Sequence, residues 1–454
     1  MVVMKFGGSS ISTPTLINNV AQIIVQRREL KPVIVVSAVG KTTSKLQTIA
    51  QNEADGNSLE SRKLLDQLEQ MHADLMREVG ADNLDCLKRQ DRYLSELRIT
   101  LQLISNRKKL SGLLKDKVLS FGELLSTNLI FAVLNSYGLN PKLLDARICM
   151  ITDEHFTHAQ LIENESAGKI REYIIPVLEA DYLPVIQGYI GSSKSGAATT
   201  LGFEGSDYSS VFIGTALNAE NVQIWKDVPG VMTADPKILS NAGIIKKMSY
   251  DEAEELALCG AKILHPKSIG PARKSDIKIS IFNTRKPDSS PTLIDKNSGI
   301  DNQLPKSVTS RNNLCVVKIQ SNSTLNDFAF YKYVFDKINS FEFSPFYIQG
   351  RYEFIFLILK DDPQIADFEK ELKPVSNVVI EKDVASISLI GQNIARDKNI
   401  EENISGMFEE HILRYSLTEN RKHSLTFIID KKYLDRYYRE IHSRFVLGSG
   451  SEKK

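Results

Sequence analysis

The chain has 454 residues, and 25% of them are charged, but acidic and basic side chains almost cancel to a formal net charge of +1. The interspersed charges exclude a basic nucleic-acid stripe or a membrane-surface helix, and no hydrophobic run approaches the ~20 residues that span a bilayer. The length is too great for one compact core, so two or three domains are expected. Four cysteines lie far apart, and a strand that begins at Val2 leaves no room for a signal peptide, so we expect a cytoplasmic protein with reduced thiols.

Short apolar runs alternate with helical patterns through the first part of the chain, which predicts an α/β domain with a largely parallel sheet. The expected strands are 2–6, 32–37, 184–189, 222–225 and 277–282, and the expected helices are 13–28, 118–136, 208–217 and 250–258. Strands that end in a glycine or serine turn before a helix place ligands at the carboxyl edge of such a sheet.

Residues 54–116 are rich in Leu, Glu, Lys and Arg at helical spacing. This pattern predicts a helical hairpin inserted into the α/β domain, which is a lid, a subunit contact or a solvated structural element. We expect the α/β domain to cover residues 1–295, followed by a polar linker at 296–310. Residues 311–454 show a weak βαβ repeat, with strands at 313–318, 354–359, 385–390 and 425–429 and helices at 329–338, 404–411 and 433–445.

A lysine and two glycines mark the end of the first expected strand. Lys5 lies in the strand, and Gly7, Gly8 and Ser9 follow it. Glycines let backbone amides approach a phosphate closely, and the lysine supplies a point charge. The spacing is not that of a Walker A loop, and a turn of this kind is also common as a purely structural feature.

Further along the chain, a glycine-rich turn at 199–209 delivers Ser206 and Asp207 to the start of a helix, where an anion can bind. Glu123 lies in an apolar run and needs a partner, which is a ligand ammonium, an internal cation or a helix cap. Asp227 follows another strand, and Lys262 follows another helix. Two lysines, two acids and several hydroxyls supply the positioning and charge that phosphoryl transfer requires.

Together these segments resemble the aspartokinases of the amino-acid kinase family. The resemblance runs in order through 5–10, 36–38, 121–126, 202–208, 227–236 and 260–266, and the two C-terminal repeats resemble paired ACT domains more weakly. It implies a three-layer αβα sandwich followed by two ferredoxin-like ACT (βαββαβ) units. The implied enzyme is a monofunctional aspartate kinase that makes 4-phospho-L-aspartate and ADP from L-aspartate and ATP with Mg²⁺, at the entry to lysine, threonine and methionine biosynthesis.

The resemblance also implies roles for individual residues. Lys5 and Lys262 would stabilise the transferring γ-phosphoryl group, and Asp207 would organise both lysines. The phosphates would lie against Gly7, Gly8 and Ser9, and the nucleotide against Lys226, Asp227, Met232 and Lys237. The substrate amino acid would be held by Ser37, Thr43, Glu123 and Ser206, with Glu123 near its ammonium. No residue is assigned as a metal ligand.

This chain departs from the family at Phe203, where an arginine that would bind a substrate carboxylate is usual. The lost contact is worth roughly 2–5 kcal/mol, unless Lys41 or Lys194 replaces it. A catalytically impaired binding or regulatory relative, or a kinase with another acceptor, therefore stays open. Lys226, Met232 and Lys237 also replace a usual threonine, tyrosine and arginine. Paired ACT units imply a homodimer or higher homo-oligomer with a lysine or threonine effector, although the segments at 328–329 and 345–348 differ from the usual effector-site residues.

Overall fold

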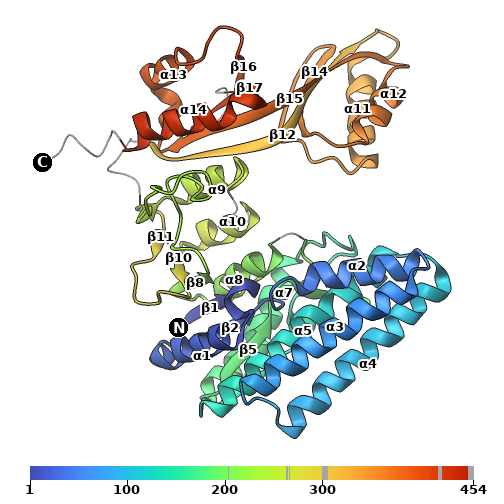
Figure 1. Ribbon diagram of the computed structural model, residues 1–454, viewed down its shortest axis with the longest axis vertical. Helices are drawn as coiled ribbons and strands as arrows, with labels where there is room; N and C mark the ends of the chain where they lie inside the picture. Colours follow the sequence, from blue (N-terminus) through green and yellow to red (C-terminus); the bar gives the residue numbers. More distant parts are fainter. Residues whose placement is uncertain (203, 262–263, 265, 299–304, 418–421, 448–454) are drawn as a thin grey trace, which may run out of the picture. The chain divides into compact units, whose positions relative to one another are not determined.

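The computed structural model describes residues 1–202, 204–261, 264, 266–298, 305–417 and 422–447. The chain divides into two compact units (Figure 1). The first contains residues 1–231, 244–250 and 263–298, and the second contains 232–243, 251–262 and 299–454. The expected first domain, continuous to residue 295, therefore lacks two segments. Ala234 and Leu239 explain the first of these differences, because both side chains belong to a hydrophobic core of the second unit.

The first unit is built on an eight-stranded sheet with the order β3-β5-β2-β1-β8-β10-β11-β9. Only β10 and β11 pair antiparallel among its described strands. The central strands β1 and β2 are buried along their whole length, as expected for continuous apolar runs in a parallel sheet. The strands are β1 (Val2–Phe6), β2 (Pro32–Val36), β3 (Pro141–Leu143), β5 (Leu183–Gln187), β8 (Asn221–Lys226), β9 (Lys247–Met248), β10 (Lys278–Asn283) and β11 (Thr292–Ile294).

Helices cover both faces of this sheet. Helices α1 (Pro14–Gln26) and α5 (Gly112–Ser136) share a hydrophobic core with one face of β1 and β2. On the other face, α8 (Gly205–Ala216) packs on β1 and β8 and contacts α7 (Glu163–Glu179) and α10 (Pro266–Ser275). The expected three-layer αβα architecture is therefore confirmed. A small sheet of β4 (Ile151–Thr152), β6 (Ile190–Ser193) and β7 (Ala198–Thr200) and the short helix α6 (Ala146–Cys149) complete this arrangement.

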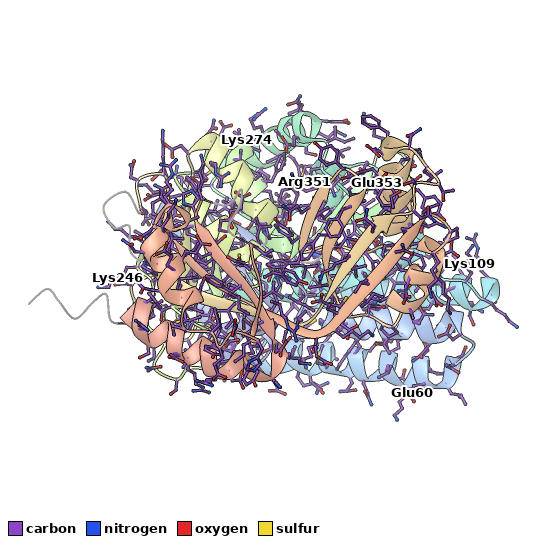
Figure 2. All side chains as sticks on the ribbon, turned by 90° about the horizontal axis from the view of Figure 1, so that it is seen from above. Glu60, Lys109, Lys246, Lys274, Arg351 and Glu353 are labelled. Atoms are coloured by element: carbon purple, nitrogen blue, oxygen red, sulfur yellow. The ribbon has the colours of Figure 1, made fainter. Side chains whose placement is uncertain are left out.

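The expected helical insertion at 54–116 contains α3 (Ser58–Glu78) and α4 (Leu84–Arg107). Helix α2 (Thr42–Ala54) packs against α3, α4 and α5 (Figure 1), and Glu60 projects away from α3 (Figure 2). Helix α5 begins at Gly112 rather than 118, because the Ser111 hydroxyl caps it by accepting a hydrogen bond from the Leu114 amide. By length and composition α5 is apolar enough to cross a bilayer, contrary to the sequence expectation, but 89% of its most apolar window is buried, as in a core helix.

The second unit contains a six-stranded antiparallel sheet with the order β13-β14-β12-β15-β17-β16. Helices α11 and α12 pack with β12 and β14 in one core, and α13 and α14 pack with β15 and β17 in another. The elements are β12 (Pro305–Ser321), α11 (Asp327–Ser340), β13 (Tyr347–Arg351), β14 (Phe354–Lys360), α12 (Ile365–Leu372), β15 (Ser376–Gly391), α13 (Lys398–Ser405), β16 (Leu413–Ser416), β17 (Ser424–Asp430) and α14 (Leu434–Ile441). Helix α9 (Tyr250–Leu258) precedes this sheet in the chain.

Two βαββαβ repeats share this sheet, and they are nested rather than strictly consecutive. The long strands β12 and β15 serve both repeats, with register shifts in their pairing between Arg311 and Val316. The first part of β12 pairs with the end of β15 and completes the second repeat. The linker expected at 296–310 is thus wrong at its end, because β12 begins at Pro305. The helix expected at 404–411 is also wrong, because α13 starts after the Asp397 cap and ends at Ser405.

Candidate active site

The candidate site lies at the carboxyl ends of β1, β2 and β8, which are adjacent in the sheet. The loops after these strands are tied together through the main chain. The Gly7 amide donates to the Trp225 carbonyl at 3.2 Å, and the Gly40 amide donates to the Gly8 carbonyl at 2.9 Å. The loop of Gly7, Gly8 and Ser9 is therefore held between the ends of its two neighbouring strands.

Gly8 is required by the close approach of two of these loops. A Cβ atom at Gly8 would lie 2.3 Å from the Ala38 carbonyl oxygen and 3.1 Å from main-chain atoms of Gly40. The neighbouring Ser9 hydroxyl donates to the Asp227 carboxylate at 2.9 Å, and both side chains are exposed. The site thus presents a glycine loop whose amides an anion can approach, with Asp227 beside it.

Asp207 is the charged centre of the site. It lies in the first turn of α8, only 1% exposed, and its two carboxylate oxygens face two lysines. Lys5 Nζ donates to Oδ1 at 2.5 Å, and Lys226 Nζ lies 3.0 Å from Oδ2. Burial by itself raises the pKa of Asp207, but the positive charges of Lys226 and Lys5 outweigh it and lower the pKa to about 2. Asp207 is therefore ionised and holds two ammonium groups at the strand ends.

Glu123 is also a buried acid, but its pKa is shifted in the opposite direction to that of Asp207. It lies on α5, 2% exposed, and its Oε1 accepts a hydrogen bond from the Ala38 amide at 3.2 Å. Its Oε2 has no hydrogen-bond partner among the residues that the structure describes. Burial raises the pKa of Glu123 to about 8, against the lowering effects of the Ala38 amide and the Lys5 charge. A buried carboxyl oxygen without a partner is a suitable acceptor for a ligand ammonium.

The predicted hydroxyl groups lie in the segment that follows β2 and in the first turns of α2 and α8. The Ser37 amide donates to the Phe6 carbonyl at 3.2 Å, and Thr43 lies in the first turn of α2. Ser206 precedes Asp207 and packs closely on Gly188. A Cβ atom added to Gly188 would lie only 2.8 Å from the Cβ of Ser206. Ser37 and Thr43 are half-buried, and Ser206 is buried.

Four residues named in the sequence analysis fall outside the part of the first unit that the structure describes. Lys262 and Phe203 lie outside the described residues, whereas Met232 and Lys237 belong to the second unit. Of the two cations that we considered for the substrate carboxylate, Lys194 pairs with Glu165 at 3.2 Å. Lys41 is exposed in the loop between β2 and α2, close in sequence to Ser37 and Thr43.

The sequence analysis missed two side chains near the site. The Thr42 hydroxyl is buried and lacks a hydrogen-bond partner within the described part of the chain. Asp116 lies on α5 seven residues before Glu123, and it accepts hydrogen bonds from the amides of Thr157 and Thr200 and from the Thr200 hydroxyl. Asp116 therefore positions β7, which leads into the Gly202 turn and α8. A carboxylate in an apolar helix was the signal, as it was for Glu123.

A magnesium ion fits this site only together with the nucleotide. The described residues contain no group of three or more His, Cys, Asp or Glu side chains that could hold a metal ion. Mg²⁺ usually takes phosphate oxygens and water, with one or two carboxylates. Asp227 is an exposed carboxylate beside the glycine loop, and it suits that limited role.

The chain matches the model of the amino acid kinase family over residues 1–283. It is 30% identical to "Aspartokinase 2, chloroplastic" of Arabidopsis thaliana, over 98% of this chain and 84% of that protein. Among solved structures, it is similar to E. coli aspartokinase III in complex with aspartate and ADP, with a TM-score of 0.87, 27% identity, and coverage of 98% of this chain and 99% of that one. The same enzyme in complex with lysine and aspartate gives a TM-score of 0.79, at 27% identity and the same coverage. The chain belongs to the amino acid kinase family, as one of its aspartokinases.

Proposed function

We propose that this chain transfers the γ-phosphoryl group of ATP to the side-chain carboxylate of L-aspartate, giving 4-phospho-L-aspartate and ADP at the first step of lysine, threonine and methionine biosynthesis. The observation that carries this proposal is Asp207, which holds Lys5 and Lys226 at the strand ends beside the glycine loop. Two fixed ammonium groups at this position suit the negative charge that a transferring phosphoryl group carries.

The acceptor explains why the site needs no general base. A carboxylate of aspartate is already ionised at neutral pH, so its oxygen attacks the γ-phosphorus without losing a proton. The bond between phosphorus and the β–γ bridging oxygen breaks, and ADP leaves with that electron pair. Asp207 is a poor base, because its lysine partners hold its pKa at about 2. Its role is to orient the lysines.

The nucleotide would lie across the ends of β1 and β8. The proposed contacts to its phosphates are the amides of Gly7 and Gly8, the Ser9 hydroxyl and the Lys5 ammonium. Mg²⁺ would enter with ATP and supply charge neutralisation between the phosphates. The remaining proposed contacts, taken from the family pattern, are Lys226, Asp227, Met232, Lys237 and Lys262.

Aspartate would bind with its ammonium at Glu123, whose free Oε2 supports this placement. Ser37, Thr43 and Ser206 would hold its remaining polar groups. Lys41 is our candidate for the substrate carboxylate in place of the usual arginine, because Lys194 is paired with Glu165.

ADP release with Mg²⁺-ATP and a panel of amino acids tests the function, with wild type compared against Phe203→Arg. Turnover with aspartate in the wild type is the expected result, and a faster reaction with another amino acid would favour a kinase with a different acceptor. No turnover with any acceptor, restored by Phe203→Arg, would mean that the natural protein is a binding or regulatory relative. Loss of turnover in Lys41→Met, with Lys194→Met unaffected, is expected if Lys41 holds the carboxylate.

Lysine is the effector that we propose for the second unit, since an aspartokinase of similar structure binds it. A cavity of about 540 Å³ lies beside the N-terminus of α11 and the β13–β14 hairpin. It is lined by Asp327, Arg351 and Glu353, and the last two are labelled in Figure 2. Two carboxylates and a guanidinium suit a zwitterion with a cationic side chain. Lysine, but not threonine, should inhibit ADP release, and Glu353→Gln should weaken that inhibition.

A homodimer through the first βαββαβ repeat is our proposal for the assembly. Phe328, which is 90% exposed, and the exposed Phe335 lie on α11, whereas the exposed Ile348 lies in the edge strand β13 and Tyr352, 76% exposed, directly follows it. Large apolar side chains gathered at an unpaired edge mark an interaction surface. Light scattering should give the mass of a dimer, and Phe328→Asp should shift it toward the monomer.

A cytoplasmic location is also proposed, because all four cysteines are buried free thiols.

A further inference from the structure

Lys226 lies closer to the centre of the site than a nucleotide contact requires. It is the last residue of β8, its side chain is 16% exposed, and its ammonium lies 3.0 Å from the buried Asp207 carboxylate. The charges of Lys226 and Lys5 both lower the pKa of Asp207. Lys226 is thus directed at the residue that organises the phosphoryl-transfer lysines.

The strand register explains this position. In the parallel pairing of β1 with β8, Lys5 lies opposite Ile224. Side chains two residues apart in a strand share a face, so Lys226 lies on the same face of the sheet as Lys5, one pair further toward the carboxyl end. This is the face covered by α8, whose first turn contains Asp207. One carboxylate therefore reaches both lysines.

The main chain fixes Lys226 at this point. Its carbonyl oxygen accepts hydrogen bonds from both the amide and the hydroxyl of Thr284, each at 2.8 Å. The preceding Trp225 is fully buried, and its carbonyl accepts the Gly7 amide of the glycine loop. The strand end that presents Lys226 is thus joined directly to the loop proposed to bind the phosphates, so the two are held in register.

We propose that Lys226 is a catalytic residue whose ammonium contacts the transferring phosphoryl group, together with Lys5. This inference rests on the proposed kinase function. As the carboxylate oxygen of aspartate forms its bond to phosphorus and the bond to the bridging oxygen of ADP breaks, negative charge gathers on the three equatorial oxygens. Lys226 and Lys5, oriented by the two oxygens of Asp207, neutralise that charge without losing their own protons.

The chemistry distinguishes this role from a contact to the nucleotide alone. A group that binds ATP and the transition state equally changes KM and leaves kcat unchanged, whereas a group that acts on the transferring phosphoryl group changes kcat. A merely structural partner of Asp207 would change stability but would not select the transition state over ADP. The transition-state mimic ADP–aluminium fluoride separates these cases, because it has a planar group in place of the transferring phosphoryl group.

The experiment compares wild type, Lys226→Met and Lys226→Arg. Lys278→Met is the control, since Lys278 is exposed at the amino end of the neighbouring strand β10, opposite Asn221. In Lys226→Met we expect kcat to fall about 100-fold, with little change in KM for ATP or in the Kd of ADP alone. Binding of ADP–aluminium fluoride in the presence of aspartate should weaken by a similar factor. Lys226→Arg should recover part of both losses, and Lys278→Met should match wild type.

A raised KM for ATP with unchanged kcat would reduce Lys226 to a nucleotide contact and overturn the proposal, as would unchanged kinetics. Equal weakening of ADP and ADP–aluminium fluoride binding would also overturn it. The proposed function fails in a different way, because the wild-type protein itself would then show no turnover with aspartate. If Lys226→Met merely destabilises the protein, urea denaturation of this variant would show a reduced free energy of unfolding. The kinetics of Lys226→Arg then decide whether Lys226 is catalytic.

Discussion

Glu123→Gln is the substitution that tests the substrate site most directly. The buried Glu123 has a pKa of about 8, against 4.5 for an ordinary glutamate, because burial disfavours its charged form. A ligand ammonium needs that charged form. If Glu123 holds the ammonium as proposed, binding of aspartate removes a proton from Glu123 wherever the pH lies below about 8.

The size of the effect follows from this pKa. About one tenth of the empty sites carry an ionised Glu123 at pH 7, so the affinity for aspartate should fall about tenfold for each pH unit below 8. Titration calorimetry between pH 6 and 8, in buffers of different ionisation enthalpy, measures both the affinity and the released proton. Glu123→Gln should bind aspartate weakly at every pH and release no proton. The exposed Glu60→Gln is the matched control and should behave as wild type.

The same substitution has a second consequence, for stability. Because the folded protein keeps a proton on Glu123 that the unfolded chain releases above pH 4.5, the contribution of Glu123 to the free energy of unfolding falls as the pH rises from 4.5 to about 8. The loss is about 1.4 kcal/mol per unit, and Glu123→Gln should lack it. An affinity for aspartate that does not vary between pH 6 and 8 in the wild type, or that varies equally in the variant, would refute the assigned role.

Three further predictions concern the charged centre, the glycine loop and the helical insertion. Asp207→Asn leaves Lys5 and Lys226 without their carboxylate, so kcat should fall at least about 100-fold. Urea denaturation should show that the free energy of unfolding is lower by about 3 kcal/mol. Because the folded pKa of Asp207 is lowered to about 2, the stabilisation by its carboxylate is present near neutral pH and lost as the pH falls toward 2. Gly8→Ala should abolish ADP release, since its Cβ would lie 2.3 Å from a carbonyl oxygen, whereas the control Gly168→Ala meets nothing within 4 Å and should keep full activity; equal activities would contradict the argument. His72→Leu should raise the free energy of unfolding by about 1 kcal/mol, because neither ring nitrogen has a partner among the described residues. The stability advantage of His72→Leu over wild type should grow as the pH falls from 6.5 to about 4, because over that range the unfolded wild-type chain binds a proton that buried His72 rejects. A difference that does not change with pH would contradict this.

Elements with strong local signals could be predicted from the sequence to within a residue or two. Strand β1 and helix α9 have the expected bounds, because an apolar run or a helical period ends at a clear boundary in each. The sharing of β12 between two repeats could not be predicted, since it depends on pairing with β15 about 75 residues away in the chain. The start of α13 was missed although Asp397 is a recognisable helix cap, because the apolar residues at 404–412 suggested a later helix.

The acids and lysines of the site were recognisable as residue types, but their partners were not. The family resemblance implied that Asp207 organises Lys5 and Lys262, and Lys5 contacts Asp207 in the structure. The second described partner, Lys226, depends on the register of β8 against β1, which no local pattern in the sequence specifies. Asp116 was passed over for the same reason, because its partners at Thr157 and Thr200 lie far along the chain.

Asp207 and Glu123 are both buried, but their pKa values are shifted in opposite directions, which suits them to different roles. Asp207 is ionised before any ligand arrives, because Lys226 and Lys5 accompany it, whereas Glu123 stays protonated until a cation reaches Oε2. The positive charge of Lys5 acts on both groups. An acid without an α-ammonium would leave Glu123 neutral and gain nothing from this arrangement, so succinate should bind far more weakly than aspartate although both present a carboxylate to the lysines. In the proposed site, selection of the amino acid and activation of the phosphoryl donor therefore depend on different acids, whose charges differ because their partners differ.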